Sequence, residues 1–271
     1  MIEERKKNKE GLKDLIRDHF DEQTNSFATS SFQDHCGSSV INHFLDSPYK
    51  YLEKKLLENI KGKKVLDYCC GTGVYSIFPA TQGAIVSGID ISSQSIKVAK
   101  DRSERMNVSD RCFFEVGDAE NLSYKSRTFD IALSLGSLTY LNLDRAFSEL
   151  HRVLKQDGIL IIIDSLGHNP IFNINRRSNI NNYASGNYEY LKSIKIDKLK
   201  KAASPYFDLV DKKYFDFLTV LGFFLFNRFK INLNSQILKN IDKIILYNEF
   251  LGKYAFKGIF VFKVRNKKLA K

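Results

Sequence analysis

Short apolar runs alternate with amphipathic stretches through the middle of the chain, from about residue 63 to residue 164. The runs are apolar at nearly every position, which is typical of strands buried on both faces of a parallel sheet. The stretches between them carry apolar residues at helical spacing, and we expect Ser92 or Ser93 to cap one of the helices. The strands predicted here are 63–69, 84–90, 112–118, 129–136 and 159–164, and two of the helices are 91–106 and 143–154.

Both ends of the chain depart from this rhythm. Residues 1–37 are mostly polar and predict a flexible N-terminal arm with one short helix. The C-terminal part predicts two further strands, with a Phe- and Leu-rich helical insertion between them. The elements expected at the ends are helices over 11–20 and 196–203, one or two helices over 39–60 joined near Pro48, strands over 206–219 and 256–265, and the insertion at about 220–254.

These elements predict a doubly wound α/β fold with a seven-stranded, mostly parallel, Rossmann-like sheet, N-terminal helices and a C-terminal helical insertion. We expect the arm to end at residue 37 and one domain to occupy residues 38–271. A chain of 271 residues can bury such a core without disulfides or a structural metal. Its four cysteines include no CxxC pair, so we expect no metal site and a reducing, cytoplasmic location. The first residues carry no apolar run, so we expect no signal peptide.

Acidic residues end three successive predicted strands, at the edge where doubly wound sheets bind ligands. Asp67 ends the first strand, and Gly71 and Gly73 follow it where the backbone must come close to a ligand. Asp90 ends the second strand, where a carboxylate can accept hydrogen bonds from both hydroxyls of a ribose. Asp118 ends the third and is placed to accept a hydrogen bond from an adenine amino group.

A dinucleotide such as NAD is the rival ligand for this arrangement. Its fingerprint is G-x-G-x-x-G followed by an acid about 20 residues later. The third glycine position is occupied by Ser76 here, and an acid also precedes the glycines. The pattern therefore favours another adenosine-containing cofactor over NAD.

The motifs together resemble those of the class I methyltransferases that use S-adenosylmethionine (SAM). The resemblance covers about residues 63–164 and is strongest to the subgroup that methylates quinones and small molecules. One departure is Cys69, which stands where the family has its first glycine. The matching stretches are VLDYCCGTG (65–73), GID (88–90), GDAE (117–120), FDIALSLGSLTYL (129–141) and ELHRVLKQDGILIIID (149–164).

The resemblance implies a last strand antiparallel to the others and a cofactor-binding role for eight residues. Gly71 and Gly73 would hold the methionine part of SAM, with Asp67 close to its amino group. The ribose would lie against Asp90 and its neighbour. The complete set of implied cofactor-binding residues is Asp67, Gly71, Gly73, Asp90, Ile91, Asp118, Ala119 and Leu135.

Candidate residues for the chemistry lie beyond the fourth and fifth predicted strands. Methyl transfer needs alignment and exclusion of water above all, and a hydroxyl or amine acceptor also needs a general base. His168 is the candidate base, because its ordinary pKa is near neutral; the alternative is a loop histidine with a structural hydrogen bond. Tyr140, Asn169 and Arg176 are candidate substrate contacts, although an arginine in this position can equally be solvated.

The net charge of +11 is concentrated in the C-terminal third. Residues 186–271 hold 18 Lys and Arg against seven Asp and Glu, which equals the excess of the whole chain. The alternatives are a solubilising face or a surface for anionic lipid headgroups beside the Phe-rich insertion. We expect a small-molecule or lipid-linked acceptor and peripheral membrane contact as partners, and no nucleic acid.

The function predicted from the sequence is SAM-dependent methyl transfer to a small-molecule, sugar-like or lipid-linked acceptor, with O- or N-methylation favoured. C-methylation of a quinone-like ring is the alternative within the same enzyme class. A protein that binds SAM without turning it over is the alternative outside it.

Overall fold

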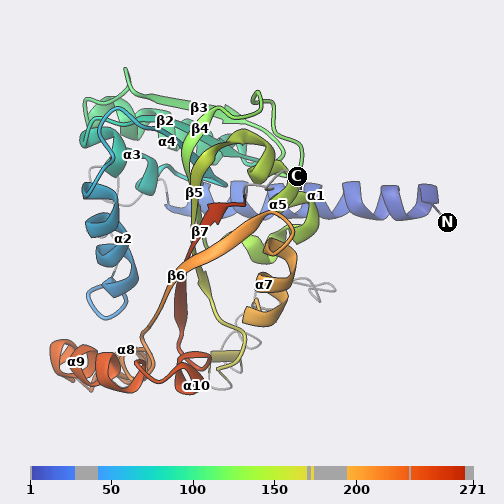
Figure 1. The fold of residues 1–271 in the computed structure, drawn as a ribbon. Helices are drawn as coiled ribbons and strands as arrows, with labels where there is room; N and C mark the ends of the chain where they lie inside the picture. The colour runs from blue at the N-terminus through green and yellow to red at the C-terminus, as the bar shows by residue number, and fades with distance from the viewer. Residues whose placement is uncertain (1, 28–41, 170–171, 174–193, 232, 266–271) are drawn as a thin grey trace, which may run out of the picture.

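A seven-stranded sheet with the strand order β3-β2-β1-β4-β5-β7-β6 forms the centre of the molecule (Figure 1). The computed structural model describes residues 2–27, 42–169, 172–173, 194–231 and 233–265. Strands β1 to β5 are parallel, and β7 runs antiparallel between β5 and β6. The predicted mostly parallel sheet and its antiparallel last strand are confirmed. The strands are β1 Lys64–Tyr68, β2 Ile85–Asp90, β3 Cys112–Val116, β4 Phe129–Leu135, β5 Leu154–Ser165, β6 Phe207–Phe215 and β7 Lys257–Val264.

Helices cover both faces of the sheet, as expected of strands that are apolar at every position. One core lies between the sheet and helices α2, α3 and α4, and includes Leu52 and Ile77. The other core lies on the side of α5 and α7, and includes Phe147 and Leu199. The helices are α1 Ile2–Phe27, α2 Ser47–Leu57, α3 Val74–Thr81, α4 Ser93–Arg105, η3 Leu138–Tyr140 (a 3-10 helix), α5 Leu143–Val153, α7 Ile196–Ala203, α8 Thr219–Phe229, α9 Ser235–Ile245 and α10 Glu249–Gly252.

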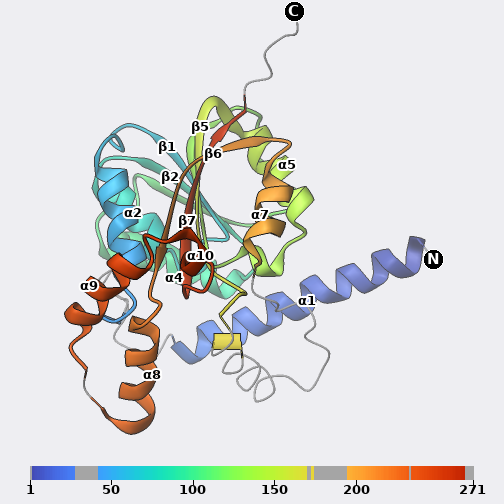
Figure 2. The same ribbon diagram turned by 60° about the horizontal axis from the view of Figure 1, so that its bottom comes forward.

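The N-terminal segment differs from the prediction of one short helix over 11–20. Helix α1 is 26 residues long, and its first half extends away from the domain (Figures 1 and 2). Its C-terminal half is held on the domain by polar contacts with α4: Asp21 accepts hydrogen bonds from Ser92 Oγ (2.5 Å) and the amide of Gln94 (3.2 Å). Pro48 also differs from its predicted place, because it lies in the first turn of α2, where proline fits the helix.

The predicted insertion consists of three short helices, α8, α9 and α10, at one end of the molecule (Figure 1). Asp242 of α9 is buried and caps the start of α8, because it accepts hydrogen bonds from the amides of Leu218 and Thr219 and from the Thr219 hydroxyl. Lys239 of α9 forms an ion pair with the buried Asp46 beside the start of α2. The insertion is therefore held against the start of α2. Among the described helices, none is long and apolar enough to span a bilayer.

The loop from β1 to α3 has an unusual backbone. Three of its residues have left-handed φ angles: Cys69 (60°), Gly71 (50°) and Gly73 (72°). A Cβ at Gly73 would lie 2.9 Å from the Cβ of Ala99, so only glycine fits there. A Cβ at Gly71 would meet nothing within 4 Å, so the space beside that residue is open. Cys69 adopts the left-handed conformation although it carries a Cβ, which costs about 1–2 kcal/mol.

This conformation predicts opposite effects for two substitutions at Cys69. Cys69→Gly should stay within about 1 kcal/mol of the wild type or be more stable, because the relieved strain offsets the greater freedom of glycine in the unfolded chain. Cys69→Val should lose about 1–3 kcal/mol, because a β-branched residue tolerates positive φ poorly. Urea unfolding of both variants measures the difference. Equal stability of the two would contradict a left-handed Cys69.

Candidate active site

Five strands end at one edge of the sheet, and the acids predicted from the sequence gather there. The strand order reverses between β1 and β4, which is the position where open α/β sheets form a ligand crevice. Asp67 lies in β1 and Asp90 ends β2, both almost fully buried. Asp118 follows β3 by two residues and is partly exposed. The structure thus brings the three predicted acids to the same edge.

Asp90 fixes the loop that precedes α3. Its Oδ2 accepts a hydrogen bond from the amide of Gly71 (2.8 Å), and its Oδ1 accepts one from the amide of Ser92 (3.0 Å). Each carboxylate oxygen keeps a second lone pair for a ligand. Ile91 lies between these contacts at the start of the turn into α4. With the open space at Gly71, this arrangement fits a ligand that donates hydroxyl hydrogen bonds.

Asp67 is held in an environment that disfavours its charge. It is 2% exposed, and the Ser76 hydroxyl donates a hydrogen bond of 2.5 Å to its Oδ2. Burial and the negative charge of Asp90 together raise the pKa of Asp67 to about 7, although the hydrogen bond from Ser76 lowers it. Burial also raises the pKa of Asp90. A cation bound beside these two carboxyl groups would favour their ionised forms.

Helix α1 contributes a contact that the sequence did not reveal. Lys13 Nζ lies 2.5 Å from Asp118 Oδ2 and 3.3 Å from Glu120 Oε2. The neighbouring Ala119 is buried, and its carbonyl accepts a hydrogen bond from Tyr68 (2.7 Å). A lone lysine in a polar segment carries no pattern that would identify it. A ligand that uses Asp118 therefore has to share it with Lys13 or displace it.

Leu135 and Tyr140 lie at the end of β4. Leu135 is the last residue of that strand, and Tyr140 belongs to the 3-10 helix that follows. The ring of Tyr140 packs edge-on against Phe20 of α1, with 5.2 Å between the ring centroids. Helix α1 therefore lies beside the predicted cofactor edge at Asp118 and at Tyr140.

His168 and Asn169 follow β5. The Nε2 atom of His168 is buried and has no hydrogen-bond partner among the described residues, and burial lowers the pKa of the imidazole. The imidazole is therefore neutral at pH 7, as a general base must be. The side-chain amide of Asn169 is bonded to the backbone at both of its polar atoms. Its Nδ2 donates a hydrogen bond to the Tyr254 carbonyl (2.8 Å), and its Oδ1 accepts one from the backbone N–H of Phe172 (3.1 Å). Arg176 lies outside the described residues.

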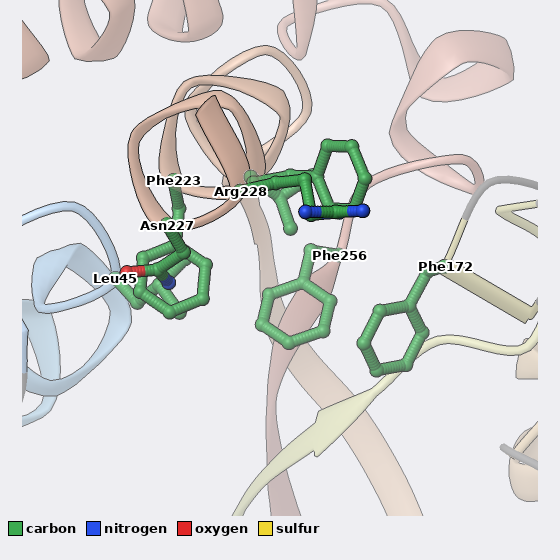
Figure 3. Close-up of a pocket in the computed structure, with 8 residues that line it drawn as sticks. Leu45, Phe172, Phe223, Asn227, Arg228 and Phe256 are labelled. Carbon is green, nitrogen blue, oxygen red and sulfur yellow. The ribbon is translucent and has the colours of Figure 1, made fainter. Parts of the chain in front are cut away.

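An apolar pocket of about 370 Å³ lies between α8 and the start of β7 (Figure 3). Phe172 and Phe256 meet edge-on there at a centroid distance of 4.3 Å. Arg228 is the charged residue of the lining and projects over Phe256 in Figure 3. Residues distant in sequence build this pocket, which is why the sequence pattern did not show it. Its lining is Leu45, Phe172, Val220, Phe223, Phe224, Asn227, Arg228 and Phe256.

Comparison of the sequence with known proteins identifies methyltransferases among its relatives. A family model described as a methyltransferase domain matches residues 65–158. MJ1252 of Methanocaldococcus jannaschii is 30% identical over 250 residues, which cover 87% of this chain and 91% of that protein. Sterol 4-C-methyltransferase strm-1 of Caenorhabditis elegans is 31% identical over 130 residues, 48% of this chain. The match spans 39% of the length of strm-1.

The solved structures show the same fold over nearly the whole chain. Geranyl diphosphate C-methyltransferase from Streptomyces coelicolor A3(2) matches with a TM-score of 0.61, over 94% of this chain and 98% of that one, at 14% identity. The sheet order and the glycine loop with its acids define a class I methyltransferase fold. The chain belongs to the class I SAM-dependent methyltransferases, enzymes whose methyl donor is SAM.

The raised pKa of Asp67 predicts that SAM binding releases protons near pH 7. SAM carries a sulfonium and an ammonium group, and positive charge near Asp67 lowers its pKa, so a carboxyl group that is about half protonated loses its proton on binding. Calorimetry in buffers of different ionisation enthalpy measures this release. Asp67→Asn should abolish it, whereas Asp101→Asn, on the exposed face of α4, should leave it unchanged. Undiminished release by the Asp67→Asn variant would contradict this role of Asp67.

Proposed function

We propose that the protein transfers the methyl group of SAM to a hydroxyl or amino group of a lipid-linked small molecule. The observation that carries this proposal is the aromatic pocket at the edge where the strands end, whose one charged lining residue is Arg228. Aromatic and aliphatic walls suit an apolar acceptor, because pockets of this kind bind chiefly by removing apolar surface from water. The name of strm-1 gives a sterol as the acceptor of that relative, which supports an apolar acceptor here.

We assign the cofactor-binding role to the residues of the sheet edge. In this assignment Gly71 and Gly73 hold the methionine part of SAM beside Asp67. Asp90 and Ile91 take the ribose, and Leu135 lies against the cofactor. Asp118 and Ala119 take the adenine after Lys13 moves off the carboxylate. On the acceptor side we retain Tyr140, His168 and Arg176 as candidate contacts and assign Asn169 to holding the loop through its backbone contacts.

C-methylation is the second candidate reaction, and a specific observation favours it. Strm-1 and the geranyl diphosphate enzyme from Streptomyces coelicolor are both named as C-methyltransferases. A quinone-like ring would fit the same aromatic pocket. The fold alone also allows a protein that binds SAM without methyl transfer, because a solved structure described as a [4+2]-cyclase shares it, with a TM-score of 0.56 at 21% identity. The described cysteines are free, which supports a reducing, cytoplasmic location.

The surface of the insertion supports delivery of the acceptor from a membrane. Nine of the 15 exposed large hydrophobic side chains in the described part of the chain lie between residues 221 and 250. Ile244 and Tyr247 are 77% and 92% exposed. Phe224 belongs both to this surface and to the pocket lining, so the pocket opens onto the exposed apolar side chains. The exposed basic residues between 221 and 250 are Arg228, Lys230 and Lys243.

Anionic lipid is the partner whose chemistry fits this surface. Apolar side chains that enter the headgroup region bind the bilayer peripherally, and each neighbouring cation adds about 1 kcal/mol near an anionic surface. Among the described residues, no carboxylate lies within ion-pair distance of Arg228, Lys230 or Lys243. These cations therefore remain available for lipid phosphates.

The first prediction for this function concerns SAM affinity. Asp90→Ala should weaken SAM binding by roughly 1.5–3 kcal/mol, because it removes a charged acceptor of ribose hydrogen bonds. Calorimetry measures the affinity, and thermal unfolding shows whether the loop contacts of Asp90 are also lost. Asp101→Ala is the matched control on an exposed helix face. Unchanged affinity for SAM after Asp90→Ala would refute the assignment of the ribose site.

The second prediction concerns membranes. The protein should float with liposomes that contain anionic lipid, and high salt should release it because salt screens the lysines. Replacing both Ile244 and Tyr247 by Ser should weaken binding about 100-fold or more, since each buried side chain contributes about 1.5–3 kcal/mol. Phe113→Ser is the control, because Phe113 is 55% exposed on β3, at the opposite edge of the sheet. Equal, negligible binding to anionic and neutral liposomes would mean that the acceptor arrives from solution.

A further inference from the structure

A buried carboxyl group beside the pocket has no role in the site described above. Asp216 follows the last residue of β6, which runs in the same direction as β5 because both are antiparallel to β7. Asp216 therefore lies at the edge of the sheet that carries Asp67 and Asp90. Its side chain is 2% exposed, and its Oδ2 has no hydrogen-bond partner within the described part of the chain. Buried polar atoms are nearly always satisfied, so an orphaned carboxylate oxygen points to a bound group.

The backbone of Asp216 supports the same conclusion. Its φ angle is +65°, a left-handed conformation that is costly for a residue with a Cβ and that clusters at functional sites. The carbonyl of Asp216 accepts a hydrogen bond from the amide of Phe256 (3.3 Å), and Phe256 forms a wall of the aromatic pocket. This hydrogen bond ties the backbone of Asp216 to the residue that forms a wall of the pocket, directly before β7.

Among the charged groups around this carboxyl group, Lys257 has the largest effect on its pKa, which it lowers. It pairs in register with Phe215, the residue before Asp216. Its Nζ donates a hydrogen bond to the Tyr49 hydroxyl (2.8 Å), and the Tyr49 ring stacks on Tyr75 at 4.9 Å. Tyr75 is the second residue of α3, directly after the glycine loop. The side chains of Lys257, Tyr49 and Tyr75 therefore form a chain of contacts from the strand beside the pocket to the start of α3, next to the loop that holds Gly71 and Gly73.

We propose that Asp216 is the general base for methyl transfer, accepting the proton of the acceptor while Lys257 stays positively charged beside it. This inference rests on the proposed function. In the step, the acceptor O–H or N–H bond breaks and its proton goes to Asp216. The electron pair left on oxygen or nitrogen forms the bond to the methyl carbon of SAM. The carbon–sulfur bond breaks with its electrons on sulfur, which becomes a neutral thioether, and Asp216 later returns its proton to solvent.

The charges around Asp216 suit it to proton transfer at neutral pH. Burial raises its pKa to about 7. Lys257 of β7 and Lys239 of α9 lower the pKa, whereas Asp242 of α9 and Asp46 beside α2 raise it. For Lys257, burial lowers the pKa, but Tyr49, Asp164 and Asp216 together outweigh that effect and raise it. The carboxyl group is therefore poised to exchange a proton, whereas the ammonium group is not.

The titration of Asp216 can be tested without any acceptor. A carboxyl group whose pKa is higher in the folded state contributes stability that is present below pH 4 and is lost as the pH rises through about 7. From pH 5 to pH 7 the unfolding equilibrium constant of the wild type should therefore rise roughly 10–100-fold relative to that of Asp216→Asn. Lys257→Met should extend this rise above pH 7. Asp208→Asn, an exposed carboxylate on the same strand, should behave like the wild type. A constant ratio between the wild type and Asp216→Asn would overturn the proposal.

Methyl transfer is measured with tritiated SAM and a total lipid extract as the probe. At saturating SAM, Asp216→Asn should slow labelling by about 10²–10⁴, while calorimetry shows SAM affinity within twofold of the wild type. The wild-type rate should rise with pH, reach half its maximum near pH 7 and level off at about pH 8. Asp216→Glu should restore that profile, which a purely structural role would not require. His168→Ala should keep it, which distinguishes the two candidate bases.

The outcomes separate this inference from the proposed function. Wild-type labelling by Asp216→Asn, or a pH limb that disappears in His168→Ala, overturns Asp216 as the base and leaves the lipid-linked acceptor in place. A wild-type protein that binds SAM but labels nothing in the extract overturns the lipid-linked acceptor and, with it, the proton transfer assigned to Asp216. If Asp216→Asn loses SAM affinity and labelling to the same extent, Asp216 has a structural role, and its assignment as the general base is overturned.

Discussion

The carboxylate of Asp90 holds together the part of the molecule on which the cofactor site depends. The loop from β1 to α3 has three residues with left-handed backbone angles, a geometry that a free chain rarely adopts. Asp90 receives the amides of Gly71 and Ser92 on its two oxygens and so ties this loop to the turn that starts α4. Charge-assisted bonds of this kind are the stronger ones in proteins, and burial strengthens them further. The parallel sheet places the ends of β1 and β2 side by side, and the hydrogen bond from Gly71 to Asp90 then fixes the loop that follows β1.

The central half of the fold could be predicted because its strands are buried on both faces. Continuous apolar runs and strand-ending acids identify β1 to β5 and place Asp67, Asp90 and Asp118 at one edge. Helix α1 could not be predicted at its full length, because its segment is polar and its docked half is held by hydrogen bonds such as those of Asp21 rather than by an apolar stripe. Hydrogen bonds between single polar residues leave no periodic signal in a sequence.

The proposed acceptor pocket could not be predicted from the sequence for a topological reason. Strand β7 enters the sheet between β5 and β6, which places Lys257 beside residues that are far from it along the chain. The pocket likewise combines Leu45, Phe172 and Phe256 from three distant segments. Asp216 looks like an ordinary surface acid in the sequence and becomes buried because the helical insertion begins immediately after it.

The division of the sheet into these two parts also explains how one fold serves different acceptors. The family model matches residues 65–158, which include the proposed cofactor edge, whereas the residues that line the pocket, together with Asp216 and Lys257, lie outside that range. The insertion grows from the β6–β7 connection and so adds walls to the acceptor side without altering β1, β2 or the glycine loop. The carboxyl group of Asp216 lies directly before the insertion, so the packing of the insertion determines how far this group is buried. Because burial and the charges of Asp242 and Lys239 on α9 set the pKa of Asp216, a change in the packing of the insertion also changes that pKa.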